Sequence, residues 1–152
     1  MNRWIQIAYD EALKGIETNE GGPFGAAIVC NGELIASAHN TVLQTNDPTA
    51  HAEINAIRKA SHLLERFDLS DCILYTTCYP CPMCMGAILW ARIPTIYYAS
   101  SMEDAARGGF DDKRFYTIIA HPNTSLNLSP LDCEEGKKLF LLWDDKNDKI
   151  IY

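Results

Sequence analysis

Residues 80–84 read Pro80-Cys81-Pro82-Met83-Cys84, and this stretch decides the fold and the chemistry expected of the chain. Proline fits the first turn of a helix but not its interior, so a helix over residues 83–91 should begin at the cysteines. Cysteines three apart in a first helical turn share one face, and their two thiolates can reach a single ion. The helix N-terminus also favours the thiolate form. The stretch therefore predicts a metal site at a helix start.

His51-Ala52-Glu53 supplies the other groups that such a site needs. His51 opens a helix expected after the turn and cap residues 46–49. With His51 as a third ligand beside Cys81 and Cys84, tetrahedral Zn²⁺ keeps its fourth position for water, as in catalytic sites. Two thiolates and a neutral imidazole cancel the charge of the ion, so the metal acidifies its bound water less than an all-histidine site would. A general base is then needed to take the proton, and Glu53 is the candidate. Residues two apart on a helix point about 200° apart, so spacing alone does not bring Glu53 to His51.

Outward from these stretches, strands alternate with helices after an opening helix and hairpin. Helical apolar spacing, short apolar runs and the turn pair Asn31-Gly32 predict these elements. They are helices over 4–16, from 51 onward, 83–91, 102–107 and 133–143, and strands over 24–30, 34–38, 72–77 and 95–99. The last of these strands is expected to be buried. The order indicates a three-layer α/β/α sandwich with a mixed central sheet, in one domain over residues 1–152.

The composition excludes several classes of protein. Thirteen Lys and Arg against 20 Asp and Glu give a formal charge of −7 over 152 residues. Binding to a phosphate backbone depends on clustered cations, so no nucleic acid partner is expected. No apolar run reaches the roughly 18 residues that span a bilayer, and Asp10 and Glu11 interrupt the N-terminal stretch that could pass for a signal peptide. A cytoplasmic protein with no membrane partner is expected.

The six cysteines fall into a crowded group and a scattered group. The crowded ones are Cys78, Cys81 and Cys84, and the scattered ones are Cys30, Cys72 and Cys133. Crowding favours a metal cluster over a disulfide framework, and disulfides are uncommon in a reducing compartment. The scattered cysteines are therefore expected to be thiols in the core.

Five blocks of sequence carry a resemblance to a known family. They span residues 21–25, 45–53, 71–75, 80–84 and 109–112. H-x-E followed by P-C-x-x-C is the signature of zinc nucleobase deaminases, and the chain resembles the cytidine deaminase-like superfamily. Within it, the first and last blocks and Tyr152 are similar to the short bacterial guanine deaminases.

The resemblance implies a reaction. One Zn²⁺ per chain would sit on His51, Cys81 and Cys84, and Glu53 would take a proton from a water that attacks C2 of guanine. Asp112 would protonate the leaving amino group, so that the products are xanthine and ammonia.

The resemblance also implies how the base is held. Asn40 would hydrogen-bond the base, and Phe24 and Trp90 would offer apolar walls for stacking. The chain would form a homodimer in which a C-terminal segment, about 120–152, is swapped between subunits. Tyr152 would then close the site of the other subunit.

Three other functions stay open at this point. A tRNA adenosine deaminase shares the residues His51, Glu53, Cys81 and Cys84, but its partner requires a basic surface. Residues 132–149 hold six acids against four lysines. A cytosine or nucleotide deaminase of the same superfamily is the second alternative. A closed structural zinc site that uses Cys78 as the fourth ligand is the third.

Overall fold

The central feature of the computed structural model, which describes residues 2–131 and 133–152, is a four-stranded sheet in the order β2-β1-β3-β4. β1 (Gly25–Cys30) pairs antiparallel with both β2 (Glu33–His39) and β3 (Cys72–Cys78). β3 pairs parallel with β4 (Thr95–Ser100). The mixed sheet predicted from the sequence is therefore confirmed.

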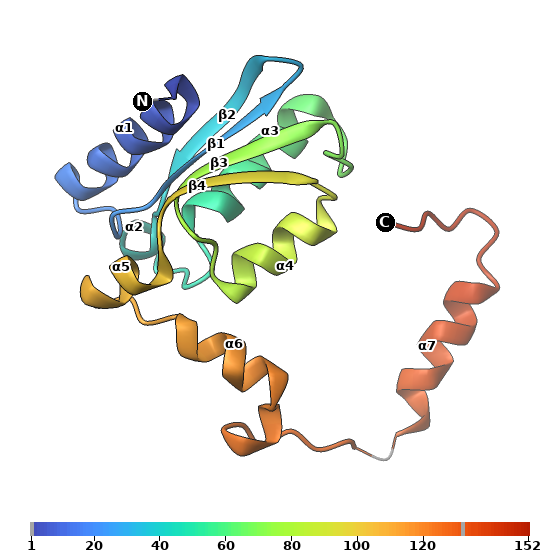
Figure 1. Cartoon of the computed structure of the whole chain (residues 1–152). Helices are drawn as coiled ribbons and strands as arrows, with labels where there is room; N and C mark the ends of the chain where they lie inside the picture. The colour runs from blue at the N-terminus through green and yellow to red at the C-terminus, as the bar shows by residue number, and fades with distance from the viewer. Residues whose placement is uncertain (1, 132) are drawn as a thin grey trace. The chain divides into compact units, whose positions relative to one another are not determined.

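Helices cover both faces of this sheet (Figure 1). α1 (Arg3–Glu17) packs on β1, β2 and β3, whereas α3 (Ala52–Leu64) packs on β1, β2 and α4 (Pro82–Trp90). Successive side chains of a strand point to opposite faces. Ala27 and Val29 accordingly belong to an apolar cluster with α1, while Ala26 and Ile28 belong to the larger cluster with α3 and α4. All six residues of β1 are buried, as expected for a strand covered on both sides.

Small side chains let α3 approach the sheet closely. Ala52, Ala56 and Ala60 are fully buried and recur every fourth residue, so they form one stripe on the helix. This stripe fixes the start of α3, where His51 and Glu53 lie, against β1 and β2.

The chain divides into two compact units, residues 2–116 and residues 117–152. The first holds the sheet with α1, α2 (Val42–Thr45), α3, α4 and α5 (Met102–Arg107); α6 (Lys113–Ala120) crosses the boundary. The second continues with the 3-10 turn η1 (Pro122–Thr124) and α7 (Glu134–Asp144). The helices α2 and α6 were not predicted from the sequence. The predicted start of α3 and both predicted ends of α1, α4, α5 and α7 lie within two residues of the observed limits. None of the helices formed by residues 2–131 and 133–152 is long and apolar enough to cross a membrane.

The prediction that residues 95–99 form a buried strand is wrong in its burial. β4 exists, but Tyr97 and Tyr98 are each 52% exposed. β4 lies at an edge of the sheet and pairs only with β3, so its side chains have fewer neighbours than those of β1. Short apolar runs do not distinguish a central strand from an edge strand.

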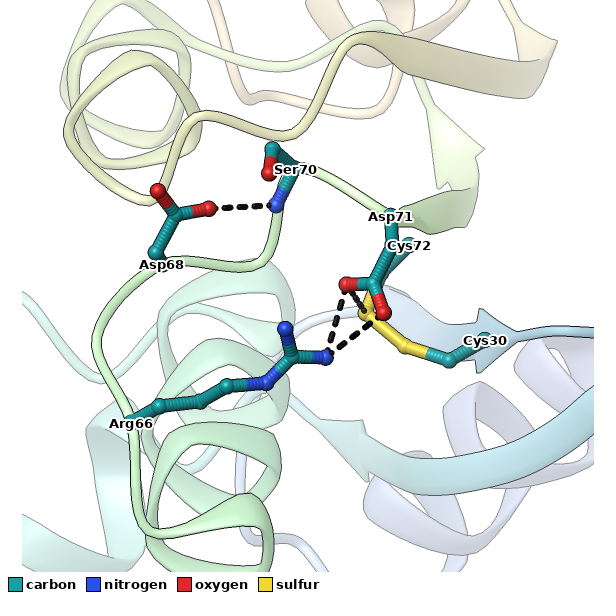
Figure 2. The surroundings of a disulfide bond; sticks show 6 residues. All are labelled: Cys30, Arg66, Asp68, Ser70, Asp71 and Cys72. Atoms are coloured by element: carbon teal, nitrogen blue, oxygen red, sulfur yellow. Dashed lines mark hydrogen bonds and ion pairs between the residues drawn. A yellow bond between two sulfur atoms is a disulfide. The ribbon is translucent and has the colours of Figure 1, made fainter.

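The expectation that Cys30 and Cys72 are separate thiols is also wrong, because the structure joins them in a disulfide (Figure 2). The register of β1 and β3 places the two cysteines opposite each other, with Cα atoms 4.3 Å apart. Beside them, the Arg66 guanidinium donates to both carboxylate oxygens of Asp71, at 2.7 and 2.9 Å. This end of the sheet is thus tied covalently and by an ion pair.

Candidate metal centre and active site

His51, Cys81 and Cys84 converge on one point, as the sequence predicts. Their donor atoms lie within 4.8 Å of one another, and Nδ1 of His51 is 3.6 Å from Sγ of Cys81 and 3.5 Å from Sγ of Cys84. Zinc bonds of about 2.3 Å to sulfur and about 2.0 Å to nitrogen, at a tetrahedral angle, separate nitrogen and sulfur by about 3.5 Å. The three side chains therefore fit a zinc ion.

Two helix starts place these ligands. His51 is the N-cap of α3, and Cys81 is the N-cap of α4 with Pro82 following it. The backbone N–H of Cys84 donates to Sγ of Cys81 at 3.5 Å, a capping contact that favours a negative sulfur. Hydrogen bonds with the Cys84 thiol and with His51 lower the pKa of Cys81 to about 4. Of the two thiols, Cys81 is therefore the one that these contacts favour as a thiolate.

Glu53 lies beside the ligands although helical spacing alone did not place it there. His51 has extended backbone angles (φ −72°, ψ 158°), so the helical rotation begins only after it. Nδ1 of His51 and Oε2 of Glu53 both lie within 3.5 Å of Sγ of Cys84. Glu53 is 5% exposed; its Oε1 accepts from the Thr76 hydroxyl at 3.0 Å and its Oε2 from the Cys84 thiol at 3.4 Å. Burial raises the pKa of Glu53. Burial therefore favours the protonated form of this carboxyl more than in water, and two hydrogen bonds fix its position for proton transfer.

Cys78 is not part of the donor cluster within the described residues. It ends β3, is buried, and its thiol donates to the carbonyl oxygen of Ser101 at 3.6 Å. Burial raises the pKa of Cys78 to about 11, which keeps it a neutral thiol. The geometry gives no support to a closed structural site with Cys78 as the fourth ligand.

A cavity of about 870 Å³ opens beside the ligands. Its walls include six of the predicted site residues: Phe24, Asn40, His51, Glu53, Cys81 and Asp112. Asn40 is 5% exposed, and its Oδ1 accepts from the backbone N–H of Val42 at 3.1 Å, which orients the amide. The cavity therefore combines apolar walls with a few fixed polar groups, as small-molecule sites do.

Asp112 reaches this cavity from the segment between α5 and α6. Its Oδ1 is buried and has no hydrogen-bond partner among the described residues. Burial and the nearby Cys81 raise the pKa of Asp112. The hydroxyl of Tyr116 donates to the carbonyl oxygen of Pro80 at 2.7 Å, which ties the start of α6 to the loop that carries Cys81. An unsatisfied buried carboxyl in a cavity calls for a ligand.

Phe110 is a cavity residue that the sequence reasoning did not single out. Its ring packs edge-on against Phe24, with centroids 4.9 Å apart, and both rings line the cavity. Phe110 stands in the block over 109–112 that carried the family resemblance. Its position two residues before Asp112 is the feature from which its place in the cavity could have been predicted.

Two predicted substrate residues are not brought to the cavity within residues 2–116. Trp90 is the last residue of α4, is 67% exposed, and is not among the residues that line the cavity. Tyr152 belongs to the unit over residues 117–152, where it is 66% exposed. The roles of Trp90 and Tyr152 in substrate binding both stay predictions.

Comparisons with known proteins agree with this site. Residues 1–100 match the family model for the cytidine and deoxycytidylate deaminase zinc-binding region. The guanine deaminase of Bacillus subtilis is 54% identical over 119 residues, which are 78% of this chain and 76% of that protein. A crystal structure of guanine deaminase from Bacillus subtilis superposes with a TM-score of 0.95 at 44% identity and covers 100% of this chain and 99% of the other. The tRNA-specific adenosine deaminase of Buchnera aphidicola is 36% identical over 115 residues, 76% of each protein.

Proposed function

This chain belongs to the cytidine and deoxycytidylate deaminase zinc-binding family, and we propose that it is the family's hydrolytic deaminase for guanine, which it converts to xanthine and ammonia. One observation carries the proposal. The fold of a guanine deaminase matches this chain along its whole length, at a TM-score of 0.95. The match therefore includes residues beyond 100, outside the part that matches the shared zinc-binding region.

The metal in this proposal is one zinc ion per chain, held by His51, Cys81 and Cys84. The N···S separations of 3.5 and 3.6 Å support this ligand set. When bound, zinc supplies a Lewis acid that lowers the pKa of a water molecule.

Glu53 is the proton carrier of the reaction. It takes a proton from water as the water oxygen bonds to C2 of guanine, and it delivers that proton to the adjacent ring nitrogen. Its burial and its two hydrogen bonds, to Thr76 and Cys84, hold the carboxyl in place for both transfers. The bond from C2 to the amino nitrogen then breaks as Asp112 gives that nitrogen a proton. The hydroxyl group on C2 loses its own proton, which restores the Asp112 carboxyl, so water and guanine give xanthine and ammonia.

Asp112 protonates the leaving amino group. The amino nitrogen of guanine is a poor leaving group until it is protonated. Burial and the nearby Cys81 raise the pKa of Asp112, which favours the protonated form that this step needs. Its buried oxygen without a protein partner is where a substrate amino group would bind.

Asn40 and two phenylalanines recognise the base. The Asn40 amide has its oxygen engaged by Val42, so its NH₂ group is the end offered to an acceptor on the base. Phe24 and Phe110 provide apolar ring surfaces in the same cavity, suited to a flat purine.

The proposal includes a cytoplasmic homodimer whose C-terminal segment, about 120–152, is exchanged between subunits. The second unit carries a row of exposed apolar side chains on α7, formed by Leu139, Phe140, Leu141 and Leu142. Exposed apolar area of this kind favours burial against a partner. Tyr152 would then reach the site of the other subunit.

Adenosine in tRNA is the second candidate substrate, because the tRNA-specific adenosine deaminase of Buchnera aphidicola is 36% identical over 76% of this chain. The formal charge of −7 opposes it, since binding RNA requires neutralising phosphates. A cytosine or nucleotide substrate has no specific observation in its favour.

An ammonia-release assay on zinc-loaded protein tests the proposal. Guanine, adenine, cytosine, cytidine and an anticodon stem-loop with a target adenosine form the panel. Release from guanine alone, or far above the rest, is expected. Release only from the stem-loop or only from cytosine would overturn the substrate assignment, and no release with full zinc occupancy would overturn the enzyme assignment.

A further inference from the structure

A buried histidine lies between two carboxylates next to Asn40. His39 ends β2 and is 7% exposed. Its Nδ1 is 2.8 Å from Oε2 of Glu11 on α1, and its Nε2 is 2.6 Å from Oε2 of Glu20, which follows α1. The Ser37 hydroxyl donates to the other Glu11 oxygen at 2.8 Å. Three segments of the chain thus meet at one imidazole, which takes no part in the reaction described above.

Hydrogen bonds join the polar groups of this cluster. Each ring nitrogen of His39 faces a carboxyl oxygen. Burial raises the pKa of Glu11, but hydrogen bonds with His39 and Ser37 outweigh it and leave the pKa below its usual value. The hydrogen bond with His39 likewise lowers the pKa of Glu20. Lys14 is the other charge that acts on both carboxylates.

The turn held by this cluster contacts Asn40 directly. An added Cβ at Gly21 would collide with the main-chain and side-chain oxygens of Asn40, so only glycine fits there. The carbonyl oxygen of Glu20 accepts from the backbone N–H groups of Leu43 and Gln44, each at 3.0 Å. The turn therefore lies against the Asn40 amide, and backbone hydrogen bonds join it to Leu43 and Gln44, which follow Asn40 in the chain.

His39 is also fixed from the side of α3. Its carbonyl oxygen accepts from Nδ2 of Asn55 at 3.0 Å. The backbone N–H of Asn40 donates to the carbonyl oxygen of Phe24 at 3.0 Å. Asn40 thus directly follows His39 in the chain, and Phe24 lies four residues after Glu20. Both residues proposed to contact the base are therefore close in sequence to residues of the cluster.

We propose that His39, clamped between Glu11 and Glu20, is a positioning residue that sets the orientation of the Asn40 amide and thereby the affinity for the purine. The inference rests on the proposed function, since Asn40 is taken to bind the base. The cluster acts through Asn40 and not on the reacting atoms. Its loss therefore changes substrate binding more than the rate of the chemical step.

Glu20→Ala is the variant that tests the clamp, because Glu20 lies in a turn and not in a helix or strand. The expected result is a KM for guanine raised about tenfold with kcat within about twofold of wild type, and unchanged zinc content. Glu20→Gln keeps an acceptor oxygen and should restore most of the KM. Glu17→Gln, at an exposed carboxylate on α1, is the matched control and should leave both constants unchanged.

A double-mutant cycle with Asn40→Ala separates positioning from general support. If the clamp acts through Asn40, Glu20→Ala has no further effect on KM once Asn40 is alanine. Two results would overturn the inference but leave the proposed function standing. One is a normal KM for guanine in an active Glu20→Ala enzyme, and the other is a double mutant whose KM change equals the product of the two single-mutant changes.

Absence of guanine turnover by the wild-type protein would overturn the proposed function, and the inference with it. If Glu20→Ala does not fold, Glu20→Ser, which also removes the carboxylate that faces His39, replaces it in the same cycle with the same expected results.

Discussion

The Sγ atom of Cys84 lies 3.4 Å from Oε2 of Glu53, although 31 residues separate them in the chain. The two side chains come from the first turns of α4 and α3, two helices that pack on each other. A candidate metal ligand and a buried carboxyl are thus in contact, as the proposed proton transfer requires. The packing of the two helix starts brings these two parts of the candidate active site together.

Glu53→Gln is predicted to keep one zinc per chain and to lose activity. Glutamine preserves the size of the side chain but cannot carry a proton, so kcat should fall about 10³-fold or more. Zinc content by atomic absorption and guanine turnover are measured on the same sample. Activity near that of wild type would remove Glu53 from the mechanism.

Replacing cysteines one at a time is predicted to distinguish Cys78 from the ligands. Cys78→Ala should retain stoichiometric zinc, because the Cys78 thiol donates to Ser101 and has a pKa of about 11. Cys81→Ala and Cys84→Ala should lose most of their zinc, because each removes one of three protein ligands. Loss of zinc from Cys78→Ala equal to that of the other two variants would point to a closed four-ligand site.

Asp112→Asn is predicted to slow the chemical step and to leave the metal in place. Asparagine cannot supply the proton that the leaving amino group needs, so kcat for guanine should fall about 10²-fold. Asp111→Asn, its neighbour in the same loop, is the matched control. Equal losses in both variants would show that the loop matters and that the Asp112 proton does not.

The Cys30–Cys72 bond is predicted to stabilise the fold without serving catalysis. Thiol titration of the denatured oxidised protein should find four thiols, from Cys78, Cys81, Cys84 and Cys133. The bond closes a loop of 42 residues in sequence separation, and in the chain-entropy model its removal by Cys30→Ala/Cys72→Ala costs about 4 kcal/mol. kcat should be unchanged below the melting temperature. Six titratable thiols would contradict the bond.

Acid is predicted to weaken the fold partly through the clamp on His39. The pKa values of Glu11 and Glu20 in the folded protein lie below their usual value of 4.5. A carboxyl with a depressed folded-state pKa contributes stability above its unfolded pKa and loses it as the pH falls through the folded value. Tm should therefore drop steeply below about pH 4.5, and less steeply in Glu20→Gln. Identical slopes in the two proteins would exclude Glu20 from this linkage.

The ligand set and the layer order could be predicted from the sequence because they depend on local patterns. Proline beside Cys81 fixes where α4 begins, and apolar runs separated by turn residues mark the strands. The pairing of Cys30 with Cys72 could not, because it depends on the register of β1 and β3. The burial of residues 95–99 was mistaken for the same reason: strand order decides which strand lies at an edge.

The site itself was predictable only in part. The convergence of Glu53 with His51 depends on the extended backbone of His51, which no periodicity reveals. The exposure of Trp90 depends on which face of α4 packs on the rest of the protein. The sequence shows only an aromatic residue at the end of a helix, and this does not predict whether the ring is exposed. Phe110 lies in the same loop as Asp112 and lines the cavity. The contact of its ring with Phe24 depends on tertiary structure, which the sequence pattern does not reveal.

The most direct test of the account is mass spectrometry of the product formed from guanine in ¹⁸O-labelled water by the zinc-loaded protein. Hydrolytic deamination at C2 predicts xanthine that carries one ¹⁸O atom, with one ammonia released for each xanthine formed. Recovery of unchanged guanine, under conditions in which the protein holds one zinc per chain, would contradict the account.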